Sequence, residues 1–336
     1  MMKIAIFGAG SIGAYIGGAL LDARADVVLI GRATMHDRIR RQGLLLTDLQ
    51  GHKVTLSGFN VPYSEDPAAL ADADLILVTV KSADTATAAA AIRSFAKSSA
   101  LVLSLQNGIG NVESLCDALV GWTVLGGMVP FNVVQMPDGR LHRGTEGELM
   151  TAMHPAIAKW EAVFSRAHLP LIQRADFVSV QWGKLLINLN NPINALCGLP
   201  LKTELSQRAF RRCLALLMDE ARKVLRVAGL HPAKVARIAP HLLPTLLRLP
   251  DFLFTRVASA MLRIDPEARS SMWEDLQAGR RTEVDYLNGA VVNLAASLGM
   301  DAPANRRIVA LIREAEKGGN TAMEGEALYR TLRDAQ

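Results

Sequence analysis

The feature that most constrains the fold is the start of the chain, where an apolar run leads through a glycine-rich turn into a helix-like segment. Residues 3–8 read KIAIFG, residues 8–13 read GAGSIG, and residues 14–23 read AYIGGALLDA. A GxGxxG turn between a strand and a helix is typical of the first βαβ unit of a dinucleotide-binding fold. The alternative is an ordinary glycine-rich turn, but both flanking segments favour the nucleotide fold.

Each of the three glycines of that turn has an expected structural role. Gly8 permits the tight turn, Gly10 lets backbone amides approach a pyrophosphate, and Gly13 lets the helix pack closely against the strand. The first turn of the helix presents unpaired N–H groups and the positive end of the helix dipole to the phosphates. We therefore expect a cofactor-binding turn made of Gly8, Gly10, Ser11, Ile12 and Gly13.

The next apolar run, DVVLIGR at residues 26–32, ends in an arginine. Chains that prefer NAD usually carry Asp or Glu at the end of this strand, where the acid binds the ribose 2′-hydroxyl. Arg32 occupies that position here, and a guanidinium suits a 2′-phosphate through charge-assisted hydrogen bonds. A basic surface loop is the alternative, but the missing acid together with Arg32 favours NADP over NAD.

Strands and helices continue to alternate after Arg32. We expect a buried strand over residues 70–82 that ends at Lys81, an alanine-rich helix over 83–96, and a strand over 100–110 that ends around Asn107. Such alternation predicts a mostly parallel, doubly wound sheet, in which ligands bind beyond the carboxyl ends of the strands. The glycine turn, Arg32, Lys81 and Asn107 all fall at strand ends, so one cleft could contain them.

Two further segments complete the predicted organisation. Residues 123–150 indicate a late hairpin around a Pro-Asp-Gly turn, and after about residue 175 the strand signal fades. Apolar residues then recur at helical spacing over 203–230, where Gly229 is expected to end the helix, and over 269–300, with a last helix from Pro303. The sequence predicts a Rossmann-like domain over residues 1–175 and an all-helical domain over residues 176–336.

The segment KLLINLNNPINAL, residues 184–196, contains a lysine and four asparagines among apolar residues. If it forms one helix, Lys184, Asn188 and Asn191 share one face. A lysine in a partly apolar cleft can have a lowered pKa and act as a general acid. The alternative is a polar helix terminus whose groups are satisfied by neighbouring loops. The alignment of the lysine with the two amides favours a functional site.

The remaining polar residues of this segment have a simpler interpretation. Asn190 and Asn194 point away from the shared face, and we expect them to bond the backbone or cap the helix end. Pro192 has no N–H, so the carbonyl of Asn188 loses its usual helical partner.

Composition excludes several classes of protein. Half of the residues are hydrophobic and 21% are charged, which is typical of a folded, soluble chain. The net charge of +5 calls for considering nucleic acid, but no nucleic-acid-binding motif is present and only 5% of residues are aromatic. We therefore expect no nucleic-acid partner, and expect some arginines to bind an anionic small molecule.

The cysteines and the apolar segments bear on the cellular compartment of the protein. Three widely separated cysteines without a CxxC pair form neither a disulfide framework nor a zinc site, which fits a reducing cytoplasm. The histidines show no ligand-like spacing, so no metal is expected. The N-terminus lacks the features of a secretory signal, and charged residues and prolines interrupt the apolar region at 241–254. No membrane partner is expected, and a homodimer is one oligomeric state that the sequence leaves open.

Taken in order, the motifs resemble those of the ketopantoate reductase (2-dehydropantoate 2-reductase) family over nearly the whole chain. The most specific part is the RTEVDYLNG segment, which follows the lysine motif by about a hundred residues. The motifs that carry the resemblance are GAGSIG, VTVKS with Lys81, QNG with Asn107, KLLIN with Lys184 and Asn188, and SSMWEDLQAGRRTEVDYLNG with Ser271, Asp275 and Glu283.

The resemblance implies NADPH-dependent reduction of ketopantoate, a small anionic 2-keto acid, to pantoate, on the route to pantothenate and coenzyme A. By analogy, Lys184 is the general acid that protonates the ketone oxygen, and Glu283 assists it. The resemblance also implies substrate contacts for Asn107, Asn188, Asn191 and Ser271, and cofactor contacts for Arg32, Lys81 and again Asn107.

Two departures from the family pattern concern the substrate pocket. Many members carry an asparagine eight residues after the lysine, where this chain has Pro192, and another three residues before the serine, where it has Ala268. One alternative is therefore a related NADP-dependent reductase of another small 2-keto or 3-hydroxy acid. An alternative of another class is a non-catalytic NADP-binding sensor.

Overall fold

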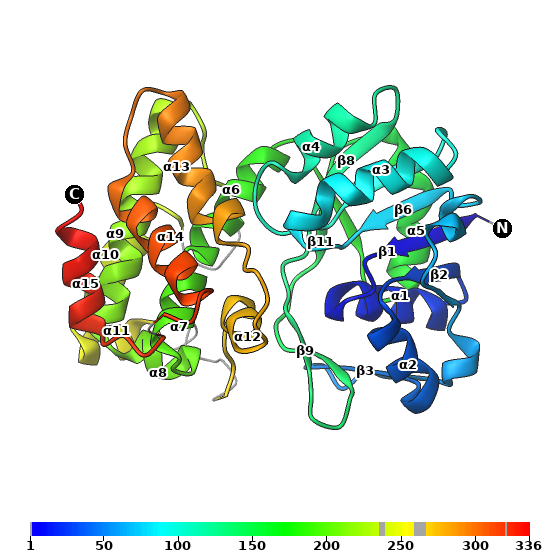
Figure 1. Cartoon of the computed structure of the whole chain (residues 1–336), viewed down its shortest axis with the longest axis horizontal. Coiled ribbons are helices and arrows are strands. Elements are labelled where there is room, and N and C mark those ends of the chain that lie inside the picture. Colours follow the sequence, from blue (N-terminus) through cyan, green and yellow to red (C-terminus); the bar gives the residue numbers. More distant parts are fainter. Residues whose placement is uncertain (1, 235–238, 259–266, 320) are drawn as a thin grey trace. The chain divides into compact units, whose positions relative to one another are not determined.

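The computed structural model describes residues 2–234, 239–258, 267–319 and 321–336. Contacts between residues divide the chain into two compact units, Met1–Phe177 and Val178–Gln336, close to the boundary expected between residues 175 and 176. The first unit contains a mostly parallel sheet with helices, and the second is helical in its described residues (Figure 1). The predicted fold class is confirmed.

The main sheet of the first unit has eight strands in the order β12-β11-β8-β7-β6-β1-β2-β5. All neighbouring strands are parallel except β8 and β11. The order reverses between β1 and β6, and the crevice at such a reversal is where this class of sheet binds ligands. The strands are β1 (Lys3–Phe7), β2 (Asp26–Ile30), β5 (Tyr63–Ser64), β6 (Leu75–Val78), β7 (Leu101–Ser104), β8 (Thr123–Met128), β11 (Leu149–Ala152) and β12 (Leu171–Arg174).

Helices cover both faces of this sheet, which explains why its central strands read as continuous apolar runs. In β1, Ile4 and Ile6 belong to the apolar cluster on one face and Ala5 to the cluster on the other. The first face packs against α1 (Ser11–Asp22) and α5 (Ala158–Arg166), and the second against α3 (Thr85–Phe95) and α4 (Asn111–Ala118) (Figure 1).

A second, four-stranded sheet lies in the same unit and was not predicted. Its order is β4-β3-β10-β9, and α2 (Ala33–Gln42) precedes β3 in the chain. The expected hairpin is confirmed for the antiparallel pair β9 and β10. The outer parts of that segment are β8 and β11, which join the main sheet instead. The strands are β3 (Leu44–Asp48), β4 (Lys53–Leu56), β9 (Val133–Gln135) and β10 (Leu141–Arg143).

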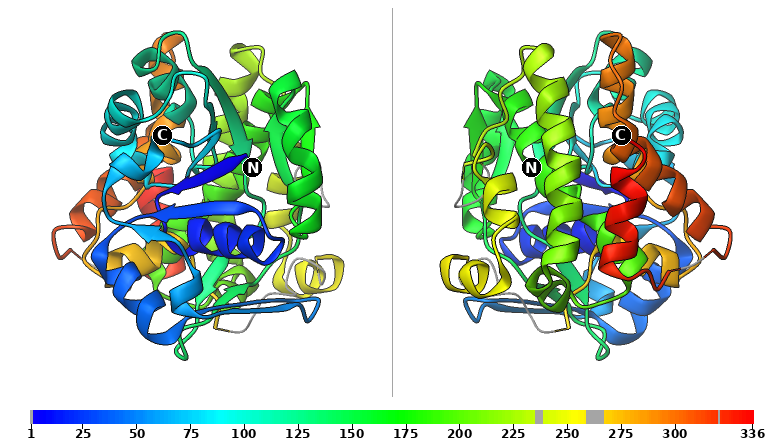
Figure 2. Two further views of the ribbon diagram at one scale, coloured as in Figure 1. Left: turned by 90° about the vertical axis from the view of Figure 1, so that its right-hand side faces the viewer. Right: turned by 90° about the vertical axis from the view of Figure 1, so that its left-hand side faces the viewer.

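The second unit contains helices α6 to α15, of which α9 and α15 lie side by side (Figure 2). Three expectations are corrected or refined here. The helix predicted over 203–230 is broken, because Gln207 adopts extended backbone between α8 and α9. Gly229, with φ +69°, follows the C-cap Ala228 of α9 as a left-handed terminating residue. The helix from Pro303 is confirmed but is not the last, since α15 follows it.

Several of these helices carry the site residues discussed below. The helices are α6 (Phe177–Asn188), α7 (Asn191–Cys197), α8 (Leu201–Ser206), α9 (Arg208–Val227), α10 (Leu243–Leu247), α11 (Asp251–Val257), α12 (Ser271–Gln277), α13 (Asn288–Ser297), α14 (Pro303–Ala315) and α15 (Gly325–Arg333). None of the helices in the described part of the chain is both long and apolar enough to span a membrane.

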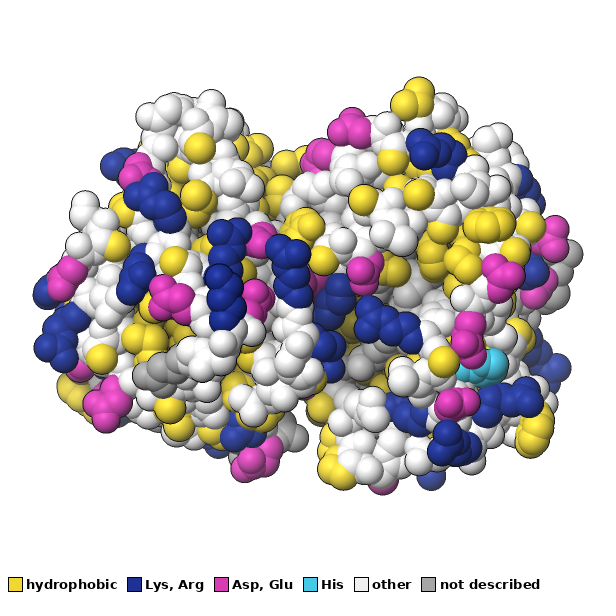
Figure 3. Space-filling view, viewed as in Figure 1, with side chains coloured by type: hydrophobic (Ala, Val, Ile, Leu, Met, Phe, Trp, Pro, Cys, Tyr) yellow, Lys and Arg dark blue, Asp and Glu magenta, His cyan; other side chains and the backbone are white. Residues whose placement is uncertain are grey.

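The surface arginines are largely interspersed with acids. Basic and acidic side chains are both spread over the visible face of each unit (Figure 3). In the helical unit, Arg306 pairs with Asp301 at 2.6 Å and Arg248 with Asp219 at 2.5 Å. This pattern agrees with a solvated, mixed-charge surface.

Candidate active site

The glycine turn between β1 and α1 has the shape that its sequence predicts. Gly8 has φ +114°, and a Cβ there would overlap the backbone nitrogen of Val80. A Cβ at Gly13 would lie 2.6 Å from Thr79 Oγ1, whereas a Cβ at Gly10 would meet no atom within 4 Å. Gly8 and Gly13 are therefore required by the fold itself, and Gly10 leaves an open approach to the first residues of α1, Ser11 and Ile12.

Arg32 lies directly before α2, two residues after the end of β2, and its side chain is exposed. Its Nη2 lies 3.5 Å from Asp84 Oδ2, and its backbone carbonyl accepts a hydrogen bond of 3.1 Å from the Tyr63 hydroxyl. The strand ends at Ile30 and is followed by Gly31 and Arg32, so the acid typical of NAD-binding chains is absent from this position.

Lys81 and Asn107 lie in neighbouring loops after β6 and β7, and a polar network connects the two loops. Lys81 directly precedes the 3₁₀ helix η3 (Ser82–Asp84). The Ser82 hydroxyl donates to the Asn107 carbonyl at 3.1 Å, and Asn111 Nδ2 donates to the same carbonyl at 2.8 Å. Sequence reasoning missed Ser82 and Asn111, although an asparagine at the start of α4 is a polar residue that would need a partner when buried.

The structure places the predicted cofactor residues of the first unit after the carboxyl ends of β1, β2, β6 and β7, which are consecutive neighbours in the sheet. This is the edge at which a doubly wound sheet binds its ligand. A glycine turn of this shape can receive a pyrophosphate, and two exposed basic side chains, Arg32 and Lys81, lie at the same edge of the sheet.

In the helical unit, Lys184 and Asn188 lie one turn apart on α6. Burial lowers the pKa of Lys184 from 10.5 to about 8, while the negative charge of Glu283 acts in the opposite direction. Glu283 is buried and immediately precedes the 3₁₀ helix η5 (Val284–Tyr286). A lysine with this pKa holds its proton at neutral pH and can release it to a basic oxygen.

The segment around Glu283 is fixed by a neighbour that sequence reasoning missed. Both the backbone N–H and the hydroxyl of Thr282 donate to Glu316 Oε1, each at 2.8 Å. Thr282 and Glu283 are both buried, so the carboxylate that acts on Lys184 has a defined position.

The single helix predicted over residues 184–196 is wrong. Helix α6 ends at Asn188 and α7 begins at Asn191, with Pro192 in its first turn, where a missing N–H costs nothing. Asn191 therefore opens a new helix and does not continue the face of Lys184 and Asn188. The expectation for Asn194 is confirmed, since its side chain bonds the backbone carbonyl of Leu199 at 2.8 Å.

The structure also shows the surroundings of Pro192 and Ala268, the two residues that depart from the family pattern. Pro192 is buried in α7, and the carbonyl of Ala268 accepts a hydrogen bond of 2.8 Å from the Leu201 N–H. Ser271 is exposed and is the first residue of α12, while its neighbour Ser270 is the N-cap.

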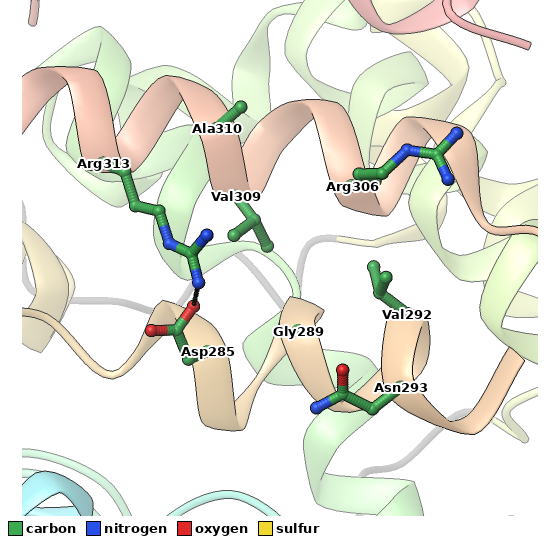
Figure 4. A pocket seen from close by; sticks show the side chains of 8 residues that line it. All are labelled: Asp285, Gly289, Val292, Asn293, Arg306, Val309, Ala310 and Arg313. Atoms are coloured by element: carbon green, nitrogen blue, oxygen red, sulfur yellow. Dashed lines mark hydrogen bonds and ion pairs between the residues drawn. The ribbon is translucent and has the colours of Figure 1, made fainter. Parts of the chain in front are cut away.

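A separate cavity of about 350 Å³ lies between α13 and α14 (Figure 4). Its charged groups are already engaged: Arg313 pairs with Asp285 at 2.5 Å, and Arg306 pairs with Asp301. None of the predicted site residues lines it. The cavity is lined by Asp285, Gly289, Val292, Asn293, Arg306, Val309, Ala310 and Arg313.

Comparison with known proteins identifies the family. The family model described as "Ketopantoate reductase PanE/ApbA" matches residues 4–155, and the model of the corresponding C-terminal region matches residues 176–316. The chain belongs to the ketopantoate reductase family. It is therefore an oxidoreductase, and the resemblance found in its motifs is confirmed.

Individual relatives cover almost the whole chain. A 2-dehydropantoate 2-reductase of Halobacterium salinarum is 31% identical over 95% of this chain and 100% of its own length. The crystal structure of a PanE/ApbA family ketopantoate reductase from Ralstonia eutropha is 32% identical, with a TM-score of 0.79 over 94% of this chain and 99% of its own. The structure of D-mandelate dehydrogenase with NADH and anilino(oxo)acetate, at 21% identity and a TM-score of 0.77, shares the fold.

Proposed function

We propose that this chain catalyses the NADPH-dependent reduction of 2-dehydropantoate (ketopantoate) to pantoate, a step toward pantothenate and coenzyme A. The observation that carries the proposal is Lys184, whose pKa is lowered to about 8 by burial and opposed by the charge of Glu283, in a chain of this family. In this proposal the first unit binds the cofactor, and the second binds the substrate and supplies the proton.

When bound, the nicotinamide cofactor supplies the hydride. The reduction of a ketone develops negative charge on the carbonyl oxygen, and a cation or proton donor at that oxygen stabilises the charge. In the proposed mechanism the ammonium of Lys184 hydrogen-bonds the ketone oxygen and donates its proton as the alkoxide forms. Glu283 favours the protonated state of Lys184, because a neighbouring negative charge stabilises an ammonium.

The polar residues around Lys184 would orient the substrate. Asn188, one turn after Lys184 on α6, would bond the substrate hydroxyl, and Ser271 its carboxylate. Asn191 offers a further amide at the start of α7. Asn107 would contact both the nicotinamide and the substrate.

NADP is the proposed form of the cofactor. Arg32 is exposed at the position where NAD-binding chains carry an acid. Lys81 follows β6, which is separated in the sheet from β2, the strand before Arg32, by β1 alone. The guanidinium can bond a 2′-phosphate in a bidentate manner, which the 2′-hydroxyl of NAD cannot reproduce. The three cysteines agree with a cytoplasmic location.

Replacement of Lys184 by alanine tests the mechanism. The variant should lose kcat by at least about a hundredfold, as expected when a general acid is removed, and should keep its affinity for NADPH. The exposed Lys223 on α9 supplies the matched control, Lys223→Ala, which should retain kcat. An unchanged kcat in Lys184→Ala would remove the lysine from this role, and NADPH binding without any turnover by the unaltered protein would favour a non-catalytic sensor.

A second candidate substrate follows from Pro192. A buried proline stands where many members present an amide, so a pocket for a different small 2-keto acid is favoured by this one position. A panel of branched 2-keto acids, assayed beside ketopantoate, separates the two candidates by their kcat/KM values.

A further inference from the structure

A buried polar cluster in the helical unit lies outside the proposed catalytic residues. It consists of Asn194 on α7, Glu204 on α8 and Ser270, the N-cap of α12 (helices in Figure 1). Asn194 and Glu204 are 0% exposed and Ser270 is 5% exposed. Fully buried polar side chains are costly unless each finds partners, so the bonds of this cluster indicate what it stabilises.

The Asn194 side chain connects three segments of the chain. Its Nδ2 donates to Glu204 Oε2 at 2.6 Å and to the Leu199 carbonyl at 2.8 Å. Its Oδ1 accepts the backbone N–H of Ser270 at 2.7 Å. The amide thus joins α7 to α8 and to the N-cap of α12, and a smaller or apolar side chain would leave several buried groups without partners.

Ser270 extends these connections to the beginning of α7. Its hydroxyl oxygen accepts the N–H of Trp273 at 3.2 Å, which caps α12, and the hydroxyl donates to the Asn191 carbonyl, also at 3.2 Å. Ser271 follows directly in the chain and is exposed. One cluster therefore fixes the backbone of two residues, Asn191 and Ser271, to which the proposed function gives substrate contacts.

A buried carboxyl group such as that of Glu204 costs folding free energy, so stability alone does not explain its presence. Burial raises its pKa to about 8, so the side chain is mostly neutral at neutral pH. The side chain of Asn190, like that of Asn194, acts on the Glu204 carboxyl and partly offsets the rise in its pKa, but the buried Oε1 has no hydrogen bond of normal geometry within the described part of the chain. An apolar residue of similar volume would avoid this cost. What Glu204 contributes is an acceptor for Asn194 Nδ2, which fixes the orientation of that amide.

We propose that Asn194, oriented by Glu204, is a positioning residue for the keto-acid substrate: it fixes the first turn of α12 and the start of α7, so that Ser271 and Asn191 face the substrate in one arrangement. The inference rests on the proposed function for the identity of the substrate. Neither residue touches the reacting atoms in this account. Loss of the cluster should therefore weaken binding of the keto acid and leave binding of NADPH unchanged.

Steady-state kinetics of four variants test the proposal. Asn194→Ala removes the connections, Glu204→Leu removes the acceptor, and Glu204→Gln keeps a neutral acceptor of the same shape. Asn293→Ala, on the exposed side of α13, is the matched control. Asn194→Ala and Glu204→Leu should raise the KM for ketopantoate by about tenfold, the effect of one lost buried hydrogen bond. Glu204→Gln and Asn293→Ala should keep the KM of the unaltered protein, and no variant should change the KM for NADPH.

An unchanged KM for ketopantoate in Asn194→Ala, or an equal rise in the KM for NADPH, would overturn the proposal. Failure of Glu204→Gln to retain the normal KM would also contradict it, because only the acceptor is required. If Asn194→Ala does not fold, Ser270→Gly replaces it: glycine is tolerated as an N-cap, so the helix persists while the bond to Asn191 is lost. This variant should raise the KM for ketopantoate severalfold, and an unchanged KM would overturn the proposal.

Hydrogen exchange separates this inference from the proposed function. The Ser270 N–H is bonded to a buried amide and should exchange slowly in the unaltered protein. In Asn194→Ala, exchange should accelerate over residues 270–277 and stay unchanged in α13. Equal exchange in both proteins would contradict the positioning role. Absence of ketopantoate turnover by the unaltered protein would instead contradict the proposed function and leave the exchange result to decide the role of Asn194.

Discussion

Replacing Glu283 by glutamine changes the pH dependence of the reaction in a direction that the structure fixes. Two influences act on Lys184: burial lowers its pKa, and the negative charge of Glu283 raises it, with a net value of about 8. Glutamine keeps the size of the side chain and removes the charge. Burial then acts with less opposition, so the pKa of Lys184 falls further and the lysine loses its proton at a lower pH.

The size of the effect follows from the protonated fraction of the lysine. With a pKa of about 8, roughly ten lysines in eleven carry the proton at pH 7 and roughly one in eleven at pH 9. The kcat/KM for ketopantoate reports the free enzyme and should therefore fall about tenfold between these two pH values. A lysine with its ordinary pKa of 10.5 would show almost no fall over this range.

The assay is the initial rate of NADPH oxidation at low ketopantoate concentration, in overlapping buffers from about pH 6 to pH 10. Glu283→Gln should move the alkaline fall to lower pH. Asp285→Asn is the matched control, because it neutralises a carboxylate two residues away that does not act on the pKa of Lys184. A flat profile in the unaltered protein would refute the reasoning, as would a fall that Glu283→Gln leaves in place or moves to higher pH.

Three further predictions concern single positions. Arg32→Ala should raise the KM for NADPH at least about tenfold and leave the KM for NADH nearly unchanged, because only NADPH carries the 2′-phosphate, and equal changes would argue against the proposed role. Gly8→Ala should destabilise the protein by more than about 1 kcal/mol in chemical denaturation, since alanine is strained at φ +114°, whereas Gly10→Ala should retain stability while losing cofactor affinity in a binding titration. Glu316→Ala leaves Thr282 without its acceptor, and should lower kcat severalfold and the free energy of unfolding by about 1–3 kcal/mol. An unchanged kcat would show that this contact does not position Glu283 for its proposed role.

The parts of the fold that sequence predicts are those set by nearby residues. The turn at 8–13 is predictable because its strand, glycines and helix are consecutive, and the parallel sheet follows from the alternation of such units. The second sheet escapes prediction because β3 pairs with β10, a strand nearly a hundred residues away, as in the register of Leu46 with Leu141. The α6–α7 break escapes it because apolar spacing continues through Leu189, while Pro192 marks a helix start as readily as an interruption.

The candidate site likewise contains residues that local sequence predicts and contacts that it does not predict. Lys184 and Asn188 were recognisable from spacing within one helix. The contacts that we propose to position the site join residues far apart in sequence: Asn194 accepts the N–H of Ser270, and Glu316 accepts the N–H of Thr282. A serine pair before a helix signals an N-cap, but the sequence does not show which buried asparagine accepts its backbone N–H. The pKa of Lys184 likewise depends on burial and on Glu283, both of which are tertiary properties.

The most direct test of the central claim is the steady-state kcat/KM for ketopantoate with NADPH, measured beside several branched 2-keto acids on the purified protein. The account predicts stoichiometric oxidation of NADPH with formation of pantoate, and a higher kcat/KM for ketopantoate than for any other acid in the panel. NADPH binding without oxidation in the presence of ketopantoate, or clear preference for another keto acid, would contradict it.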